Sequence, residues 1–305
     1  MQCRAACIEE FAEAKIALRM LVSDAQVHLW EVHRPDRPWP QGQQRPPHRP
    51  NGFSPEEMLA EMNAAGVDRA VIVPPTWVGE NNATALQAAA RYPRRFAVVG
   101  RFDVKAADAR AQLEGWPKQP HMLGVRMSFH VKPFVDWLDD GALDWFWASC
   151  ERLGIPVMAL VPGMAHKLLP IAERHRGLNL LVPHMACPLD TRGADAFAKL
   201  DGLLALARYP GVVVMVSSAP CFSRESYPFR DLHPFLKCIY DVFGPRRMLW
   251  GADLSRLTST YAECLDLFQQ ALDFLSAEDK EWILGKTLSQ VLRWPEASSV
   301  PNRQS

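Results

Sequence analysis

The sequence predicts a (β/α)8 barrel, which is a ring of eight parallel strands surrounded by helices. Three observations favour this fold class. Eight short segments rich in Val, Ile and Leu recur between residues 21 and 251. Segments with helical periodicity separate the apolar segments, and Gly or Pro commonly follows each helical segment. Most of the apolar segments do not alternate with polar residues, which is typical of strands buried on both faces of a parallel sheet.

The expected elements follow one another in a regular order. Strands are expected at residues 21–28, 67–73, 96–102, 122–127, 155–161, 178–183, 212–217 and 248–251. Helices are expected at residues 54–65, 81–91, 108–116, 144–153, 165–176, 194–208, 232–243, 261–275 and 278–292. Ser54 before Pro55 and Ser276 before the last helix are the clearest capping residues. A doubly wound open sheet is the alternative, but no expected strand is followed by a glycine-rich phosphate-binding motif.

Composition narrows the class of protein. The chain has 305 residues, 48% hydrophobic and 22% charged, which is ordinary for one large α/β domain. Lys plus Arg and Asp plus Glu are equal at 34 each, so no net charge favours nucleic acid or an anionic membrane as partner. The seven cysteines lack metal-type spacing, which predicts a reduced, cytoplasmic protein. The expected partner is a small-molecule substrate, and a homo-oligomer is left open.

The domain layout is expected to be simple. Residues 1–20 are expected to be an N-terminal extension, since they carry Glu9, Glu10 and Glu13 and lack the apolar segment of a secretory signal. The barrel is expected at 21–294 and a C-terminal tail at 295–305. The proline-rich loop 33–53 is too long to be a plain connection, so we expect it to fold over the strand ends as a lid with Trp39 on the substrate side.

Polar residues gather where the expected strands end, which is where the active site of a barrel lies. Alternation along the first strand places Asp24, Gln26 and His28 on one face and Ala25, Val27 and Leu29 on the other. The sixth strand ends in His184 and the eighth in Asp253, whereas the fifth ends in Val-Pro-Gly and offers no ligand. We therefore expect Asp24, His28, His184 and Asp253 around one mouth, with Arg126 and Ser128 from the fourth strand beside them.

Each of these residues also has a structural interpretation. His184 after Pro183 is compatible with a satisfied loop histidine, and Asp253 with a side chain that caps the following turn. Arg126 is compatible with an ion pair to Asp103. Ser217 and Ser218 lack the context of a serine nucleophile, so the sequence does not favour a serine hydrolase.

Three motifs carry a resemblance to a known family. Asp24-x-Gln26-x-His28-x-Trp30 resembles the D-x-H-x-H-x-W opening of the amidohydrolase superfamily, in its family 2 branch. Val182-Pro183-His184 resembles the Asp-His-x-Gly end of that branch's sixth strand, and Trp250-Gly251-Ala252-Asp253 its Phe-Gly-Ser-Asp end of strand eight. The resemblance spans 21–294. It implies a barrel hydrolase similar to lactonases of pyrones and sugar lactones, or a metal-dependent decarboxylase of aromatic acids.

The sequence departs from the family pattern at the metal. Gln26 stands where the family has His, and the fifth strand supplies neither His nor Lys. A single Zn or Mn ion would rest on His28, His184 and Asp253, which is few for a metal site. The family's lactonases of dicarboxylated pyrones are understood to work without metal and also lack the strand-five ligand. We therefore expect no cofactor and keep a divalent metal as the alternative.

Without metal, the chemistry must come from side chains. Asp253 is the expected general base for a water, while His28, His184 and Gln26 polarise the carbonyl. Arg126 is the expected anchor of a substrate carboxylate, with Ser128 and Trp39 as further substrate contacts. The function predicted is hydrolysis of a small carboxylated lactone or related ester. The alternatives are a metal-dependent non-oxidative decarboxylase, although 216–219 lacks its histidines, and a catalytically decayed metabolite-binding barrel.

Overall fold

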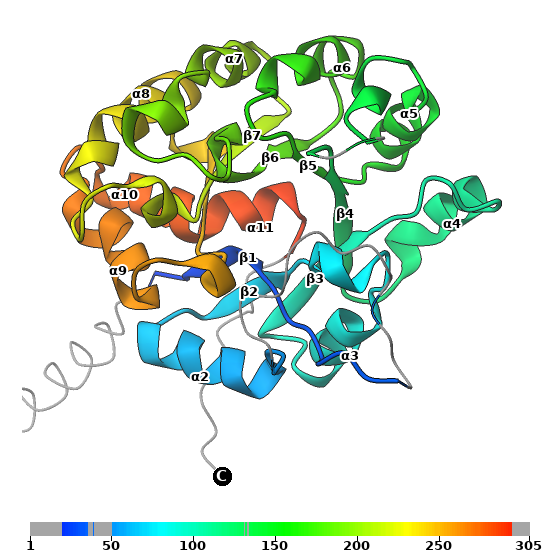
Figure 1. Cartoon of the computed structure of the whole chain (residues 1–305), viewed down its shortest axis with the longest axis horizontal. Coiled ribbons are helices and arrows are strands. Elements are labelled where there is room, and N and C mark those ends of the chain that lie inside the picture. The colour runs from blue at the N-terminus through cyan, green and yellow to red at the C-terminus, as the bar shows by residue number, and fades with distance from the viewer. Residues whose placement is uncertain (1–19, 36–38, 40–50, 131, 133, 295–305) are drawn as a thin grey trace, which may run out of the picture.

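Eight parallel strands form one sheet in chain order, as expected of a (β/α)8 barrel (Figure 1). The computed structural model describes residues 20–35, 39, 51–130, 132 and 134–294. The strands are β1 (Ser23–Val27), β2 (Arg69–Ile72), β3 (Phe96–Arg101), β4 (Met122–Ser128), β5 (Val157–Leu160), β6 (Leu180–Val182), β7 (Val212–Ser217) and β8 (Met248–Gly251). The expected extension 1–20, except for Met20, and the tail 295–305 lie outside the described residues.

The ends of the sheet meet between β8 and β1. The backbone N–H of Asp253 donates to the carbonyl oxygen of Gln26 at 2.9 Å. One carboxylate oxygen of Asp24 also accepts the N–H of Ala252 at 3.0 Å. These bonds hold the segment after β8 against β1 and bring the last strand beside the first. The prediction of the barrel is confirmed.

Helices surround the strands (Figure 1). They are α2 (Pro55–Ala65), α3 (Ala83–Arg91), α4 (Ala109–Gly115), α5 (Asp144–Leu153), α6 (Leu169–Arg174), α7 (Leu200–Leu204), α8 (His233–Phe243), α9 (Tyr261–Asp266), α10 (Ala277–Glu281) and α11 (Thr287–Val291). The capping predictions are confirmed, because the hydroxyls of Ser54 and Ser276 accept backbone N–H groups in full capping boxes. Gly66 and Gly154 end α2 and α5 with left-handed backbone, as helix-ending glycines do.

Several helices are shorter than the sequence pattern predicts. The helix expected at 194–208 is divided into a 3-10 turn (Gly193–Phe197), α7 and a second 3-10 turn (Ala205–Arg208). The last two expected helices contain π-helical turns at Leu267–Ala271 and Trp282–Lys286. The second of these turns passes close to the start of β1, since a Cβ added to Gly285 would lie 2.2 Å from the carbonyl oxygen of Leu21. Packing against the barrel thus overrides ideal helix geometry.

The barrel interior is closed at the amino ends of the strands. Its apolar cluster includes Ala25, Val71, Val99, Met158, Leu181, Met215 and Leu249, with Leu288, Leu292 and Trp294 from the C-terminal segment packed against them. The Arg69 guanidinium lies 4.3 Å from the centre of the Trp294 ring and donates to the Trp294 carbonyl at 3.2 Å. A plugged amino end leaves the carboxyl end for the site.

The strict alternation expected for β1 is wrong. Ala25 belongs to the cluster inside the barrel, whereas Asp24 bonds Tyr261 of α9 in the outer layer. The pairing of β1 with β2 shifts between Asp24 and Val27, as in a β-bulge. The extra residue lets Gln26 turn inward after Ala25, because a bulge reverses the order of the faces.

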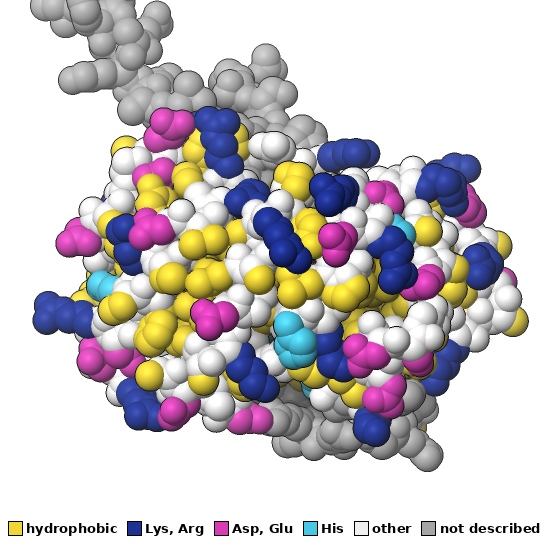
Figure 2. Space-filling view, turned by 90° about the horizontal axis from the view of Figure 1, so that it is seen from above, with side chains coloured by type: hydrophobic (Ala, Val, Ile, Leu, Met, Phe, Trp, Pro, Cys, Tyr) yellow, Lys and Arg dark blue, Asp and Glu magenta, His cyan; other side chains and the backbone are white. Residues whose placement is uncertain are grey.

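No helix of the described residues is long and apolar enough to cross a membrane. The face seen in Figure 2 carries positive and negative side chains intermingled, with apolar side chains between them. This pattern agrees with the equal counts of acidic and basic residues.

Candidate active site

Three residues at the ends of neighbouring strands share an unusual backbone. His184 after β6, Ser218 after β7 and Asp253 after β8 have φ angles of 56°, 49° and 49°. Left-handed backbone is uncommon outside glycine, and such strain gathers at functional sites. Here it lets the side chains of consecutive strand ends converge.

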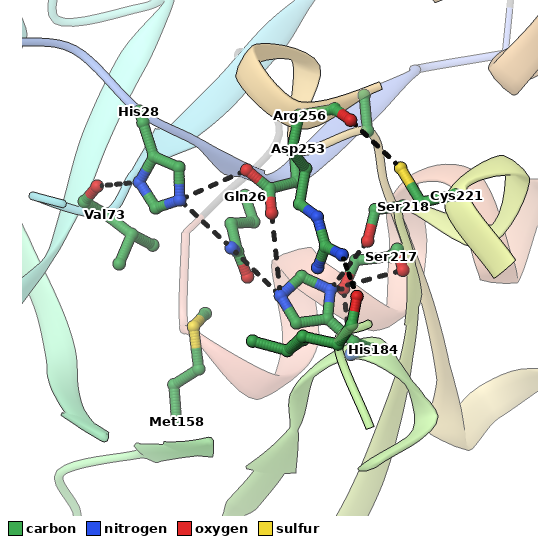
Figure 3. A network of polar contacts seen from close by, with 12 residues as sticks. Gln26, His28, Val73, Met158, His184, Ser217, Ser218, Cys221, Asp253 and Arg256 are labelled. Carbon is green, nitrogen blue, oxygen red and sulfur yellow. Dashed lines mark hydrogen bonds and ion pairs between the residues drawn. The ribbon is translucent and has the colours of Figure 1, made fainter. Parts of the chain in front are cut away.

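Asp253 lies between two imidazoles (Figure 3). Its Oδ1 is 3.1 Å from Nε2 of His28, and its Oδ2 is 3.6 Å from Nε2 of His184. Both carboxylate oxygens thus face an imidazole nitrogen, and Oδ1 has no hydrogen-bond partner among the described residues. An ionised oxygen buried in this way can accept a proton from water.

Electrostatics keep Asp253 ionised. Burial alone would raise its pKa, but the favourable electrostatic interactions with His28 and Arg256 outweigh that effect. Together they hold the pKa of Asp253 well below its usual range. The carboxylate is therefore a base at any ordinary pH.

The two histidines are held by different partners. Nδ1 of His28 lies 2.6 Å from the carbonyl oxygen of Val73, so Nδ1 carries a proton. Nδ1 of His184 lies 2.9 Å from each of the hydroxyl oxygens of Ser217 and Ser218. Burial lowers the pKa of His184 to about 3, although the charge of Asp253 opposes the shift, so its ring is neutral.

Gln26 joins the imidazoles to Arg126. Its amide nitrogen lies 3.4 Å from Nε2 of His28 and 3.4 Å from Nε2 of His184. Its amide oxygen lies 3.4 Å from Nη1 of Arg126, which is the sensible orientation because a guanidinium has only donors. Two N–H groups of the amide are therefore directed at the middle of the site.

Arg126 is a buried guanidinium whose recorded neighbours include no carboxylate within ion-pair distance. Its Nη1 contacts Sδ of Met158 at 2.9 Å as well as Gln26. Burial, and then the nearby charge of Arg101, lowers the pKa of Arg126 to about 9, which leaves it charged at neutral pH. Ser128, two residues further along β4, has a buried hydroxyl without a partner among the described residues. Both side chains are suited to an anionic, oxygen-rich ligand.

The structure brings together most of the site residues expected from the sequence. Gln26, His28, His184 and Asp253 meet at one mouth, and Arg126 reaches them through Gln26. The ion pair considered between Arg126 and Asp103 is not formed in the described structure; Arg101 instead pairs with Glu80 at 3.0 Å.

Asp24 does not reach the mouth, which corrects the expectation. Its carboxylate accepts from the backbone of Gln26 at 2.8 Å, from Ala252, and from the Tyr261 hydroxyl at 2.8 Å. Burial raises its pKa to about 7 despite these bonds. It ties β1 to β8 and α9 instead of touching a substrate.

Trp39 is separate from this cluster in its recorded contacts. Its indole N–H donates to the Glu31 carbonyl at 3.3 Å, and its backbone N–H donates to His33. The remainder of the expected lid, at 36–38 and 40–50, lies outside the described residues. The substrate-side position of Trp39 stays a prediction.

Sequence reasoning missed the contacts of the two serines at the end of β7. The sequence presents Ser217 and Ser218 only as candidate nucleophiles, yet both hydroxyls contact His184. The signal available was their position, since they occupy the end of strand seven in the same way that His184 and Asp253 end strands six and eight.

The residues present do not fit a metal ion. In the described part of the chain, no group of three or more His, Cys, Asp or Glu side chains is arranged to hold one. The Gln26 amide N–H groups occupy the space between the two imidazoles. The guanidinium of Arg126 adds positive charge where a cation would need negative charge.

A parallel barrel with imidazoles and a carboxylate gathered at its strand ends defines this chain as a barrel enzyme. Residues 23–293 match the amidohydrolase family, and the chain belongs to it. It is thus a hydrolase of that family.

Named relatives and a solved structure place it further. The chain is 28% identical over 246 residues to an L-fucono-1,5-lactonase of Burkholderia ambifaria, covering 79% of this chain and 83% of that one. It is 28% identical over 267 residues to a 4-sulfomuconolactone hydrolase of Hydrogenophaga intermedia, covering 82% and 84%. An amidohydrolase from Burkholderia multivorans with bound zinc has a TM-score of 0.77 at 22% identity, covering 90% of this chain and all 100% of that one. The structural likeness concerns the fold.

Proposed function

We propose that this protein hydrolyses a small lactone that bears an anionic group, without a metal ion. The observation that carries the proposal is that one side of the site can accept a proton and the other side can donate hydrogen bonds. Oδ1 of Asp253, which lacks a hydrogen-bond partner within the described part of the chain, lies 3.1 Å from Nε2 of His28. The amide nitrogen of Gln26 lies 3.4 Å from Nε2 of His184.

The reaction follows from these positions. Asp253 takes a proton from water as the water oxygen attacks the lactone carbonyl carbon. The carbonyl electrons move to the oxygen, which is held by N–H groups of Gln26 and His184. When the carbonyl re-forms, the ring C–O bond breaks and the leaving alkoxide takes the proton back from Asp253. His28 differs from the sequence-based expectation, since its Nε2 faces Asp253 at 3.1 Å, where it orients the carboxylate instead of polarising the carbonyl.

The buried guanidinium of Arg126 supports an anionic substrate. No described carboxylate pairs with this guanidinium, and a charged group in the interior is costly unless a ligand supplies the counter-charge. Carboxylate and sulfonate groups both accept two parallel N–H bonds from arginine. The sulfonated lactone in the name of one relative agrees with this charge preference.

A panel of lactones tests the proposal. We expect hydrolysis of five- or six-membered lactones that carry a carboxylate or sulfonate, with weaker activity on neutral sugar lactones. Arg126→Met is expected to raise KM for the anionic lactones by about 10-fold or more and to leave KM for neutral ones nearly unchanged, because a hydrogen bond to a charged group contributes about 1.5–3 kcal/mol. Release of CO2 from aromatic acids with no lactone hydrolysis would instead identify a decarboxylase.

A further inference from the structure

His184 has two possible neutral forms, and its neighbours distinguish them. If Nδ1 carries the proton, Nε2 presents a lone pair to the site, as in histidines that bind metals. If Nε2 carries the proton, the ring donates a hydrogen bond into the site. The contacts of Nδ1 therefore decide what the ring can do at the reacting atoms.

The hydroxyl of Ser217 is constrained by the backbone. Its oxygen accepts the backbone N–H of His184 at 3.1 Å and lies 2.9 Å from Nδ1 of the same residue. Ser217 is fully buried, and its hydroxyl has no other acceptor among the recorded bonds of the described residues. The hydroxyl proton therefore points to Nδ1, which must then be the unprotonated nitrogen.

Ser218 adds a second hydroxyl to the same nitrogen. It is also fully buried, and its oxygen lies 2.9 Å from Nδ1 of His184. A proton on Nδ1 would leave both hydroxyl protons without an acceptor, and buried donors without partners are costly. The competing acceptor for such a proton is the Ser217 carbonyl oxygen, at the longer distance of 3.3 Å.

We propose that Ser217 and Ser218 are positioning residues that hold His184 as its Nε2–H tautomer, so that the ring donates into the site and cannot act as a metal ligand. In this form Gln26 and His184 each direct an N–H from nitrogens 3.4 Å apart. Both of these nitrogens are then donors, so neither accepts from the other. Oδ2 of Asp253, at 3.6 Å, is the protein acceptor nearest to Nε2, and a substrate carbonyl oxygen placed between the two nitrogens can accept from both. The donation from Nε2–H of His184 to a substrate carbonyl oxygen rests on the proposed function, whereas the assignment of the tautomer does not.

The tautomer can be measured without substrate. Protein labelled with 15N in histidine gives ring nitrogen shifts that separate protonated from unprotonated nitrogens, and the His184→Asn variant assigns the signal. At neutral pH we expect Nε2 of His184 to be protonated and Nδ1 bare. A protonated Nδ1 with a bare Nε2 in the wild-type protein would overturn the proposal, whatever the protein hydrolyses.

Serine variants test the cause. In the Ser217→Ala/Ser218→Ala double variant, the Ser217 carbonyl is the remaining partner of Nδ1, so the proton is expected to move there. For any lactone that is hydrolysed, kcat should fall by about 10- to 100-fold, by analogy with the partners that orient metal-binding histidines, with KM little changed. A double variant that keeps the Nε2–H signal would contradict the role of the serines.

Two further variants separate this role from general damage. Each single alanine variant retains one hydroxyl on Nδ1 and is expected to keep the Nε2–H tautomer, so it also serves if the double variant does not fold. Ser23→Ala is the matched control, because it removes a buried hydroxyl that accepts from Arg69 at 2.9 Å on the opposite end of β1. It should leave the His184 signal unchanged; a shift equal to that of the double variant would argue for a merely structural effect.

Discussion

At the scale of single residues, the site depends on side chains placed by strained backbone. Asp253 and His184 both adopt left-handed φ angles, and neither is a glycine. Strain of this kind costs of order 1–3 kcal/mol per residue and persists only where surrounding contacts impose it. The Asp253 N–H bond to Gln26 and the serine contacts to His184 are such contacts.

Asp253→Asn tests the general base. Asparagine has the same shape and tolerates left-handed backbone, so the fold should be retained. Loss of the base is expected to lower kcat by about two orders of magnitude or more. Steady-state kinetics with the best lactone of the panel, together with thermal unfolding, provide the measurement. A variant with near wild-type kcat would remove Asp253 from the chemistry.

The pH dependence of kcat/KM tests the state of Asp253. Its pKa is held below the ordinary value of 3.8, so the active carboxylate persists as pH falls. We expect no loss of activity due to Asp253 between pH 7 and about pH 4. Initial rates over this range, corrected for spontaneous hydrolysis, show whether this holds. The contradicting result is a loss of wild-type activity centred near pH 5 or 6 that is absent from the residual activity of the Asp253→Asn variant.

At the scale of elements, β1 shows what a sequence pattern can and cannot predict. The spacing of Gln26 and His28 placed both at the mouth, but the bulge that turns Asp24 to α9 leaves no mark in an alternating pattern. The sequence predicts the ends of the strands because each apolar segment stops at a polar residue, Gly or Pro. Left-handed backbone at His184 and the proton-sharing serines of β7 depend on contacts between strands, which one sequence does not display.

Asp24→Asn tests the tie between β1, β8 and α9. The folded pKa of about 7 exceeds the ordinary value of 3.8, so the folded state keeps a proton that the unfolded chain releases. This contribution to stability is full below about pH 4 and is lost as pH rises to about 7. Asparagine cannot titrate, yet it still accepts the N–H groups of Gln26 and Ala252. The unfolding temperature of the Asp24→Asn variant should therefore fall less between pH 5 and pH 8 than the unfolding temperature of the wild-type protein.

Asp68→Asn is the control for that comparison. The Asp68 carboxylate also accepts a backbone N–H beside β1, from Val22 at 2.8 Å, but it is only partly buried. The Asp68→Asn variant shows whether removing any carboxylate that accepts a backbone N–H beside β1 produces the same change, so the effect belongs to Asp24 only where the two variants differ in the pH dependence of their unfolding temperature. Equal pH dependence in the wild-type and Asp24→Asn proteins would mean that Asp24 is ionised in the folded state.

At the scale of the whole molecule, the barrel has one closed end and one reactive end. Arg69 and Trp294 close the amino end of the strands, while β1, β6, β7 and β8 direct polar groups to the other end. The fold is shared with a zinc-containing amidohydrolase. In this chain the amide of Gln26, the two serines that contact His184 and the guanidinium of Arg126 supply hydrogen-bond donors where a metal ion would need ligands.

Metal content together with activity tests this account most directly. The protein is purified without added metal, its zinc and manganese are measured by mass spectrometry, and lactone hydrolysis is compared before and after chelation. We predict metal far below one ion per chain and unchanged activity after chelation. One zinc or manganese ion per chain, with activity lost on chelation and restored by that ion, would contradict the account.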